Sequence, residues 1–238
     1  MIGGVIFLKK HPDGYVTYLV AIIVILCITI SILHNISKKK FKEEVLTHLD
    51  NCRAGMFIEE LTELAGTKRS RQIRSFYASL CATGYDVLGD YDALYASCQN
   101  IKLRSHMPVY HRRMFSYYLS RNELEYAKDA LNALSALASA EKIPAEKKVI
   151  VQFEEECKRA LQVSMGELEE PMKYYREMLN STEEKPLVTR VSYAVSFGDV
   201  LVRTGDMEAA KEPLLFASSR GGDTKYKKQA DRLLKEIQ

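Results

Sequence analysis

The chain has 238 residues, of which 47% are hydrophobic, 34 are Lys or Arg and 31 are Asp or Glu. Twelve Gly and six Pro are too few for an all-β domain, which needs a turn about every 8–12 residues. The net charge of +3 is local, because residues 1–40 contain five Lys and one Asp. Residues 41–238 carry 29 basic and 30 acidic side chains, so the overall charge does not support a nucleic-acid-binding surface.

Residues 15–36 are predicted to form one transmembrane helix. The stretch Gly14–Ser37 contains no charged residue, and about 20 apolar residues suffice to cross a hydrocarbon core of ~30 Å. Tyr15 and Tyr18 stand where aromatic side chains anchor a membrane span. The alternative, a cleaved signal peptide, needs a shorter apolar core and small residues at its cleavage site. The core here is followed instead by Leu33–Ile36, a Leu-His-Asn-Ile sequence.

The charges beside this helix predict its orientation. Residues 1–14 form a short tail with two Lys, and four Lys follow the helix in and just after the basic segment 37–40: Lys38, Lys39, Lys40 and Lys42. The positive-inside rule therefore places the N-terminus outside and residues 41–238 in the cytoplasm. The same four lysines are expected to contact anionic lipid headgroups. The cysteines of residues 41–238 show no paired spacing, as is typical of a reducing compartment.

A short pattern recurs five times in residues 41–238. It consists of a turn residue, any residue, an apolar residue and then a helix with apolar side chains at helical spacing. The turn residues are Gly55, Gly89, Asn122, Gly166 and Gly205, which lie 34, 33, 44 and 39 residues apart. Gly and Asn supply the left-handed backbone that ends one helix before another begins. The pattern predicts an all-α solenoid of about five helix–turn–helix repeats.

Prolines and a final charged segment complete this prediction. Pro108, Pro144 and Pro186 each begin an apolar-periodic run, as proline does in the first turn of a helix. The longer spacings are therefore expected to lengthen the first helices of the fourth and fifth repeats. Lys225–Ile237 follows the break at Gly221–Asp223 and is predicted to be the cap helix that a stack of repeats needs at its end.

The pattern resembles the tetratricopeptide repeat, a helix–turn–helix unit of 34 residues. Tyr85 and Tyr118 match the aromatic residue of that family's first helix, and Gly198 matches its close-packing glycine. Ala127 and Ala210 match its small residue five positions after the turn. At the other three positions the family's small residue is replaced by Glu60, Leu94 and Pro171. The sequence also lacks the family's Trp. The resemblance implies a concave groove, lined by the first helices, that holds an extended or helical peptide.

Helical spacing gives eight candidate peptide-binding residues on the first helices. They are Ser79, Thr83, Val109, Arg112, Ser116, Leu119, Glu156 and Asp199. Arg112 and Ser116 are expected to matter most, since they lie one turn apart between two apolar neighbours. Members of the family that clamp the tails of chaperones use Asn and Lys on this row. The corresponding asparagine positions here are Thr83, Ser116, Ala160 and Asp199, which argues against a chaperone-tail receptor.

The sequence therefore predicts a single-pass membrane protein whose helical repeat domain, residues 41–238, is a protein-binding scaffold at the cytoplasmic face. The chain contains no phosphate-binding glycine loop, dinucleotide fingerprint or zinc-protease motif. Its His and Cys residues lack metal-ligand spacing. We accordingly expect no enzymatic activity, no cofactor or metal, and no nucleic acid or small-molecule substrate as partner. The alternatives are an extracytoplasmic assembly or chaperone-like factor with inverted topology and, more remotely, a helical enzyme.

Overall fold

A computed structural model describes residues 41–66, 70–181 and 184–237, and every regular element in these ranges is a helix. The all-α prediction is thus confirmed for this part of the chain. The chain divides into two compact units, residues 1–46 and 47–238. Of the first unit, the structure describes a helical turn at residues 41–46 that includes the π-helix η1 (Lys42–Leu46).

The predicted membrane helix at residues 15–36 lies outside the described residues, as do the tail 1–14 and the basic segment 37–40. Within the ranges that are described, no helix is both long and apolar enough to cross a membrane.

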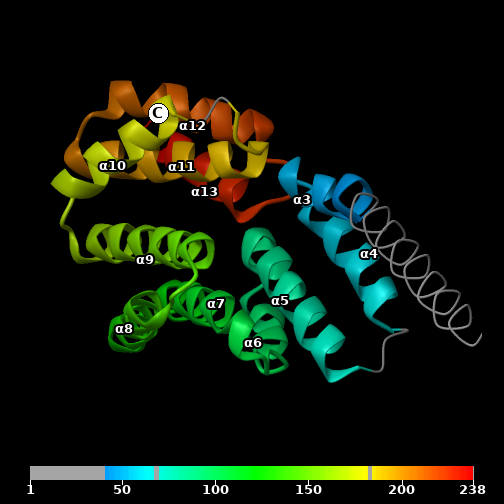
Figure 1. Cartoon of the computed structure of the whole chain (residues 1–238). Coiled ribbons are helices and arrows are strands. Elements are labelled where there is room, and N and C mark those ends of the chain that lie inside the picture. The colour runs from blue at the N-terminus through cyan, green and yellow to red at the C-terminus, as the bar shows by residue number, and fades with distance from the viewer. Residues whose placement is uncertain (1–40, 67–69, 182–183, 238) are drawn as a thin grey trace, which may run out of the picture. The chain divides into compact units, whose positions relative to one another are not determined.

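The helices of the second unit follow one another as pairs joined by short turns (Figure 1). The pairs are α3 (Thr47–Asp50) with α4 (Ala54–Gly66), α5 (Arg71–Leu88) with α6 (Tyr91–Cys98), α7 (Met107–Ser120) with α8 (Leu124–Ala140), α9 (Pro144–Met165) with α10 (Glu169–Asn180), and α11 (Leu187–Thr204) with α12 (Met207–Arg220). The 3-10 turn η2 (Arg104–His106) precedes α7, and α13 (Lys225–Glu236) ends the chain. Each helix packs mainly on the helices before and after it, as in a solenoid.

Left-handed residues form four of the predicted turns. Gly89, Gly166 and Gly205 have φ angles of 82°, 83° and 86°, and Asn122 has a φ of 59°. At two of these turns the next residue caps the second helix. Asp90 accepts a hydrogen bond from Ala93 N at 3.0 Å, and Asp206 accepts one from Ala209 N at 3.2 Å.

The first turn differs from its prediction. Cys52, with a φ of 61°, is its left-handed residue, and Gly55 is the second residue of α4. The shift has a physical cause, because the carboxylate of Asp223 accepts hydrogen bonds from the first amides of α4 and lets that helix begin at Ala54.

The first helices of the longer repeats differ in length. The helix α9 has 22 residues against 14 in α7, so the fourth pair has a lengthened first helix, as predicted. The first helix of the fifth pair, α11, has 18 residues, so it is longer than α7 but equal in length to α5.

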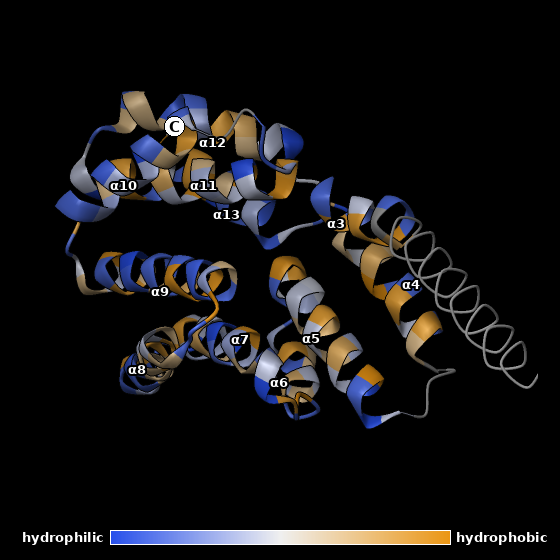
Figure 2. Cartoon of the chain, viewed as in Figure 1, coloured by the Kyte–Doolittle hydropathy of each residue, from blue (hydrophilic) through white to orange (hydrophobic). Residues whose placement is uncertain are grey.

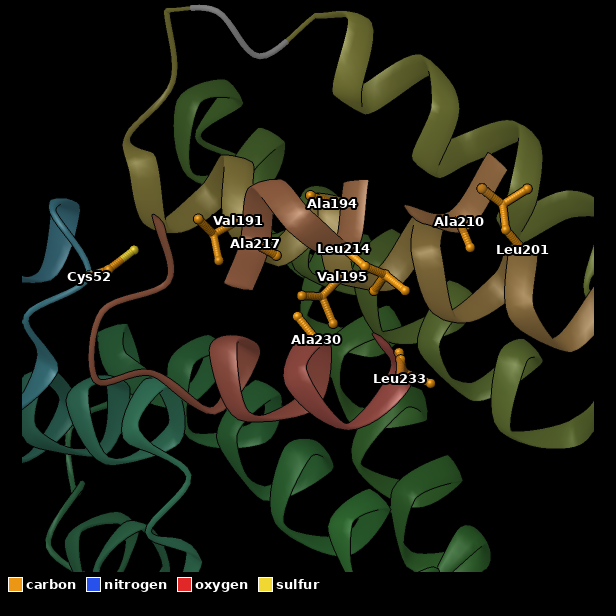
Figure 3. Close-up of a cluster of buried hydrophobic side chains, with 10 residues drawn as sticks. All are labelled: Cys52, Val191, Ala194, Val195, Leu201, Ala210, Leu214, Ala217, Ala230 and Leu233. Carbon is orange, nitrogen blue, oxygen red and sulfur yellow. The ribbon is translucent and has the colours of Figure 1, made fainter. Parts of the chain in front are cut away.

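Hydrophobic and hydrophilic residues alternate along most of the helices (Figure 2). The buried hydrophobic residues form clusters where consecutive helices pack on one another, and these contact regions are called seams below. Gly198 lets α11 approach α12 closely, because a Cβ atom at this position would lie 2.5 Å from Leu214 Cδ2. Ala127 and Ala210 are fully buried at the corresponding positions of α8 and α12. Figure 3 shows the seam of the last pair, where Ala230 and Leu233 of α13 pack toward α11 and α12: the cluster contains Cys52, Val191, Ala194, Val195, Leu201, Ala210, Leu214, Ala217, Ala230 and Leu233. The C-terminal helix therefore covers the last pair, as predicted.

Candidate binding groove

The first helices α5, α7, α9 and α11 line an open groove made of two adjoining hollows of about 300 Å³ and about 670 Å³. Six of the eight candidate residues line it: Thr83, Arg112, Ser116, Leu119, Glu156 and Asp199. Ser79 is buried, and its hydroxyl donates to the Phe76 carbonyl at 2.7 Å. Val109 is half-buried and lines neither hollow.

The last helix, α13, lies in this groove. Lys225 and Tyr226 line both hollows, so the first turn of α13 borders each of them. The sequence predicted only a cap on the final repeat and missed this second role. The apolar side of α13 packs on α11 and α12, while its charged side faces the groove and reaches α5.

A buried ion cluster joins α13 to the first helices α5 and α7. Asp86 of α5 is only 2% exposed. Its carboxylate accepts hydrogen bonds from Lys225 Nζ at 2.7 Å and from the guanidinium of Arg113, and the Ser116 hydroxyl lies 3.4 Å away. Burial alone would raise the pKa of Asp86, but the charges of Lys225 and Arg113 outweigh it and hold that pKa well below its usual range.

This cluster links residues that are far apart in the sequence. Asp86 and Lys225 are separated by 139 positions. The carboxylate of Asp86 raises the pKa of the Lys225 amine against the effect of burial, so both groups are ionised at neutral pH. Removing one member of such a group leaves an uncompensated buried charge. The cluster therefore makes the position of α13 in the groove depend on α5 and α7.

A second polar network lies beside it, between α7, α9 and α11. Glu156 accepts hydrogen bonds from the guanidinium of Arg112, from Tyr193 OH at 3.1 Å and from Gln152 Nε2 at 3.0 Å. The Arg112 guanidinium also lies over the Phe153 ring, 4.4 Å from its centroid. Burial and the charge of Glu156 raise the pKa of Tyr193, which keeps that hydroxyl protonated.

These contacts change the expected role of Arg112. The sequence suggested an inward-facing cation available to a peptide, but this guanidinium is paired with Glu156 inside the groove wall. Replacing Arg112 and Ser116 by Glu would place new carboxylates beside Glu156 and Asp86, so that change would destabilise the fold as well as the groove.

The loop before α13 fastens the C-terminal segment to the first described pair. Asp223 accepts hydrogen bonds from Ala54 N at 2.7 Å and Gly55 N at 2.8 Å, and its own amide donates to the Cys52 carbonyl at 3.2 Å. Gly222 has a φ of 57°, and a Cβ atom there would collide with the same carbonyl. Glycine is thus required at this junction.

Sequence reasoning missed four charged residues of this arrangement: Asp86, Arg113, Asp223 and Lys225. The sequence contains one indication of this cluster. Asp86 lies next to Val87 on a buried face of α5, where the spacing of apolar residues predicts an apolar side chain. A charged residue on a buried face indicates a buried partner. No local pattern indicated which partner, because the cations come from α7 and α13.

Compared with known families, curated proteins and solved structures, the chain shows no significant match.

Of the four predicted headgroup lysines, Lys42 begins η1, and Lys38, Lys39 and Lys40 lie outside the described residues.

Proposed function

We propose that the chain is a membrane-anchored scaffold whose tetratricopeptide-like solenoid captures a peptide segment of a partner protein in the groove of α5, α7, α9 and α11. The observation that carries this proposal is the gathering of six inner-face residues from four successive first helices along one open groove. Repeat solenoids use such continuous concave surfaces for extended ligands.

The order and spacing of the helix pairs support the tetratricopeptide-like description. Four turns carry the expected left-handed residue, and the close-packing Gly198 and the small Ala127 and Ala210 occupy seam positions. In the proposed arrangement residues 15–36 anchor the chain in the membrane, with the N-terminus outside. Residues 41–238 then lie in the cytoplasm, and Lys38, Lys39, Lys40 and Lys42 lie near the lipid headgroups.

Unpaired cysteines support the cytoplasmic orientation over the extracytoplasmic alternative. All four described cysteines are free: Cys52, Cys81, Cys98 and Cys157. Burial raises the pKa of Cys52 to about 11 and the pKa of both Cys98 and Cys157 to about 12, so these thiols react slowly. Free thiols are typical of a reducing compartment.

Site-specific photo-cross-linking tests the groove. Ser164 and Ser219 are both exposed serines whose hydroxyls donate to a carbonyl of their own helix, but only Ser164 lines the groove. With a photoreactive amino acid at each position of the full chain in its own membrane, a partner should be captured from position 164 and not from position 219. Equal capture from both positions, or capture from 219 alone, would place the binding face elsewhere.

A thiol introduced at the surface tests the orientation better than the native cysteines, since three of those are buried. In intact cells, a membrane-impermeant maleimide should label the variant Ser219→Cys only after the membrane is opened. The native chain serves as the control for background labelling. Labelling of the introduced thiol before the membrane is opened would favour the extracytoplasmic factor.

A further inference from the structure

The larger hollow of the groove has an uneven charge distribution. Among its lining residues four are cationic and one, Asp199, is anionic. The cations are Lys225, Lys228 and Arg232 of α13 and Arg203 of α11. Three of these cations have a carboxylate partner, so the excess is one of cationic side chains that line the hollow.

The packing of α13 determines which of its residues face the hollow. Lys225, Lys228 and Arg232 follow one another at spacings of three and four, and therefore share one side of the helix. Ala230 and Leu233 on another side are buried against α11 and α12. The apolar contacts that hold α13 in place thus turn its basic side toward the groove.

Both arginines keep hydrogen-bond donors for a ligand. Arg203 Nε lies 3.1 Å from Asp199 Oδ1, and Arg232 Nε lies 3.6 Å from Glu236 Oε1. Arg203 Nη1 also donates to the Val163 carbonyl at 3.5 Å. An arginine has five N–H donors, so these contacts leave most of the donors for other acceptors. The side chains of Arg203 and Arg232 are 46% and 66% exposed, and a ligand can reach them.

The two lysines differ in whether they can bind a ligand. Lys225 is committed to the buried carboxylate of Asp86. Lys228 Nζ donates to the Leu88 carbonyl at 3.4 Å, a neutral acceptor that stabilises the position of the amine without neutralising its charge. Lys228, Arg203 and Arg232 are therefore the three cations that the hollow offers to a ligand.

From this arrangement we infer that the larger hollow binds an acidic, extended peptide segment of a partner protein, whose carboxylates pair with Lys228 and Arg232 of α13 and Arg203 of α11. The inference rests on the proposed function and specifies the chemistry of the partner. Charge-assisted hydrogen bonds to carboxylates are stronger than neutral ones. These cations lie outside the row of first-helix positions that clamp chaperone tails in the family the sequence resembles.

The spacing of the cations predicts the spacing of the carboxylates. Lys228 and Arg232 are four residues apart, which corresponds to a rise of about 6 Å along α13. In an extended peptide, side chains on the same face are two residues apart, or about 6.6–6.8 Å. A segment with Asp or Glu at alternate positions therefore matches the basic side of α13.

A peptide-binding measurement on the full chain tests the inference. The protein is held in nanodiscs of neutral phosphatidylcholine, and the probe is a fluorescent decapeptide of alternating Glu and Ser. The same peptide with Gln in place of Glu is the neutral control. By fluorescence anisotropy the acidic peptide should bind with a salt-dependent affinity, and the neutral peptide should bind about tenfold more weakly or worse.

Two double variants separate local from general electrostatics. Lys228→Gln with Arg232→Gln should weaken binding of the acidic peptide by about tenfold or more. Lys128→Gln with Lys211→Gln removes the same charge from α8 and α12. These two lysines pair with Glu125 and Glu208 and line neither hollow, so affinity should change less than about twofold. Helical circular dichroism and its melting curve check that each variant is folded.

Several results would overturn the inference. One is failure of the native chain to bind the acidic peptide, and another is an equal loss of binding in both double variants. A third is binding of anionic vesicles that depends on Lys228 and Arg232 when peptide binding does not, which would make the hollow a lipid-facing surface. Cross-linking from Ser164 is independent of the probe, so the proposed function can survive each of these results.

Discussion

The seams between helices and the centre of the groove are both buried, but they are built from different interactions. The seam around Gly198 and Leu214 consists of apolar side chains from α11, α12 and α13. The centre of the groove contains ionised side chains, with Asp86 held by Arg113 and Lys225. Each seam stabilises two or three neighbouring helices, whereas the buried ion cluster connects α13 to α5 and α7, which lie far from it in the sequence.

This difference indicates how the two regions respond to change. Apolar burial is divided over many contacts, so the loss of one side chain leaves the others in place. A buried ion cluster depends on each member, because the remaining charges stay desolvated when one is removed. Substitutions in the two regions should therefore differ in their pH dependence.

The largest effect is expected from Asp86→Ala. This change leaves Arg113 and Lys225 without their shared carboxylate and should lower the free energy of unfolding by about 3–5 kcal/mol. Urea denaturation followed by circular dichroism measures it. Asp92→Ala is the control, since Asp92 pairs with Arg121 at the surface and is 91% exposed, and it should cost less than about 1 kcal/mol. Similar losses for both variants would show that the buried ion cluster contributes no more to the free energy of unfolding than a surface ion pair does.

The same cluster predicts a pH dependence. Asp86 has a lowered pKa in the folded chain, so its contribution is complete above the unfolded value of about 3.9 and is lost as the pH falls through the folded value. The difference in unfolding free energy between the native chain and Asp86→Asn should therefore shrink as the pH falls from about 6 to about 3. A difference that stays constant over this range would contradict the ionised pairing.

The seam is tested by two adjacent leucines of α12. Leu214 is fully buried and Leu215 is 57% exposed, so both changes to Ala alter the same helix but only one opens a cavity. Leu214→Ala should lower the free energy of unfolding by about 2–5 kcal/mol. Leu215→Ala should cost less than about 1 kcal/mol. Equal urea midpoints for the two variants would mean that the seam is not packed as described.

Gly198→Ala tests close approach in the same seam. The added methyl group would lie 2.5 Å from Leu214 Cδ2, and the resulting overpacking should cost about 1–3 kcal/mol. The double variant with Leu214→Ala removes the opposing side chain, so its loss should be smaller than the sum of the two single losses. Strict additivity in the urea midpoints would argue against a direct contact.

The sequence predicts the seams better than the groove, for a physical reason. Gly89, Gly166 and Gly205 mark turns because their left-handed backbone is a local requirement, and apolar spacing between turns shows which helix faces are buried. The same logic places Thr83 and Glu156 on the inner side of their helices.

The remaining features depend on contacts that no local pattern contains. Lys225 and Asp223 belong to the last segment of the chain, yet they bond to Asp86 of α5 and to the first turn of α4. The left-handed Cys52 is explained only with the C-terminal loop in place, since its carbonyl accepts from the amide of Asp223. The position of α13 beside the groove therefore follows from the structure and not from the sequence.

The smallest effect is expected at the second polar network. Tyr193→Phe removes the hydrogen bond from the hydroxyl to Glu156, and it should lower the free energy of unfolding by about 1 kcal/mol. The loss is smaller than at Asp86 because Glu156 keeps its bonds to Arg112 and Gln152, so no buried charge is left unpaired. Tyr126→Phe, at a ring that is 59% exposed, should change stability by less than about 0.5 kcal/mol. A loss at Tyr193 as large as that at Asp86 would show that the second network also fails as a unit, which would make the whole polar interior of the groove one cooperative element.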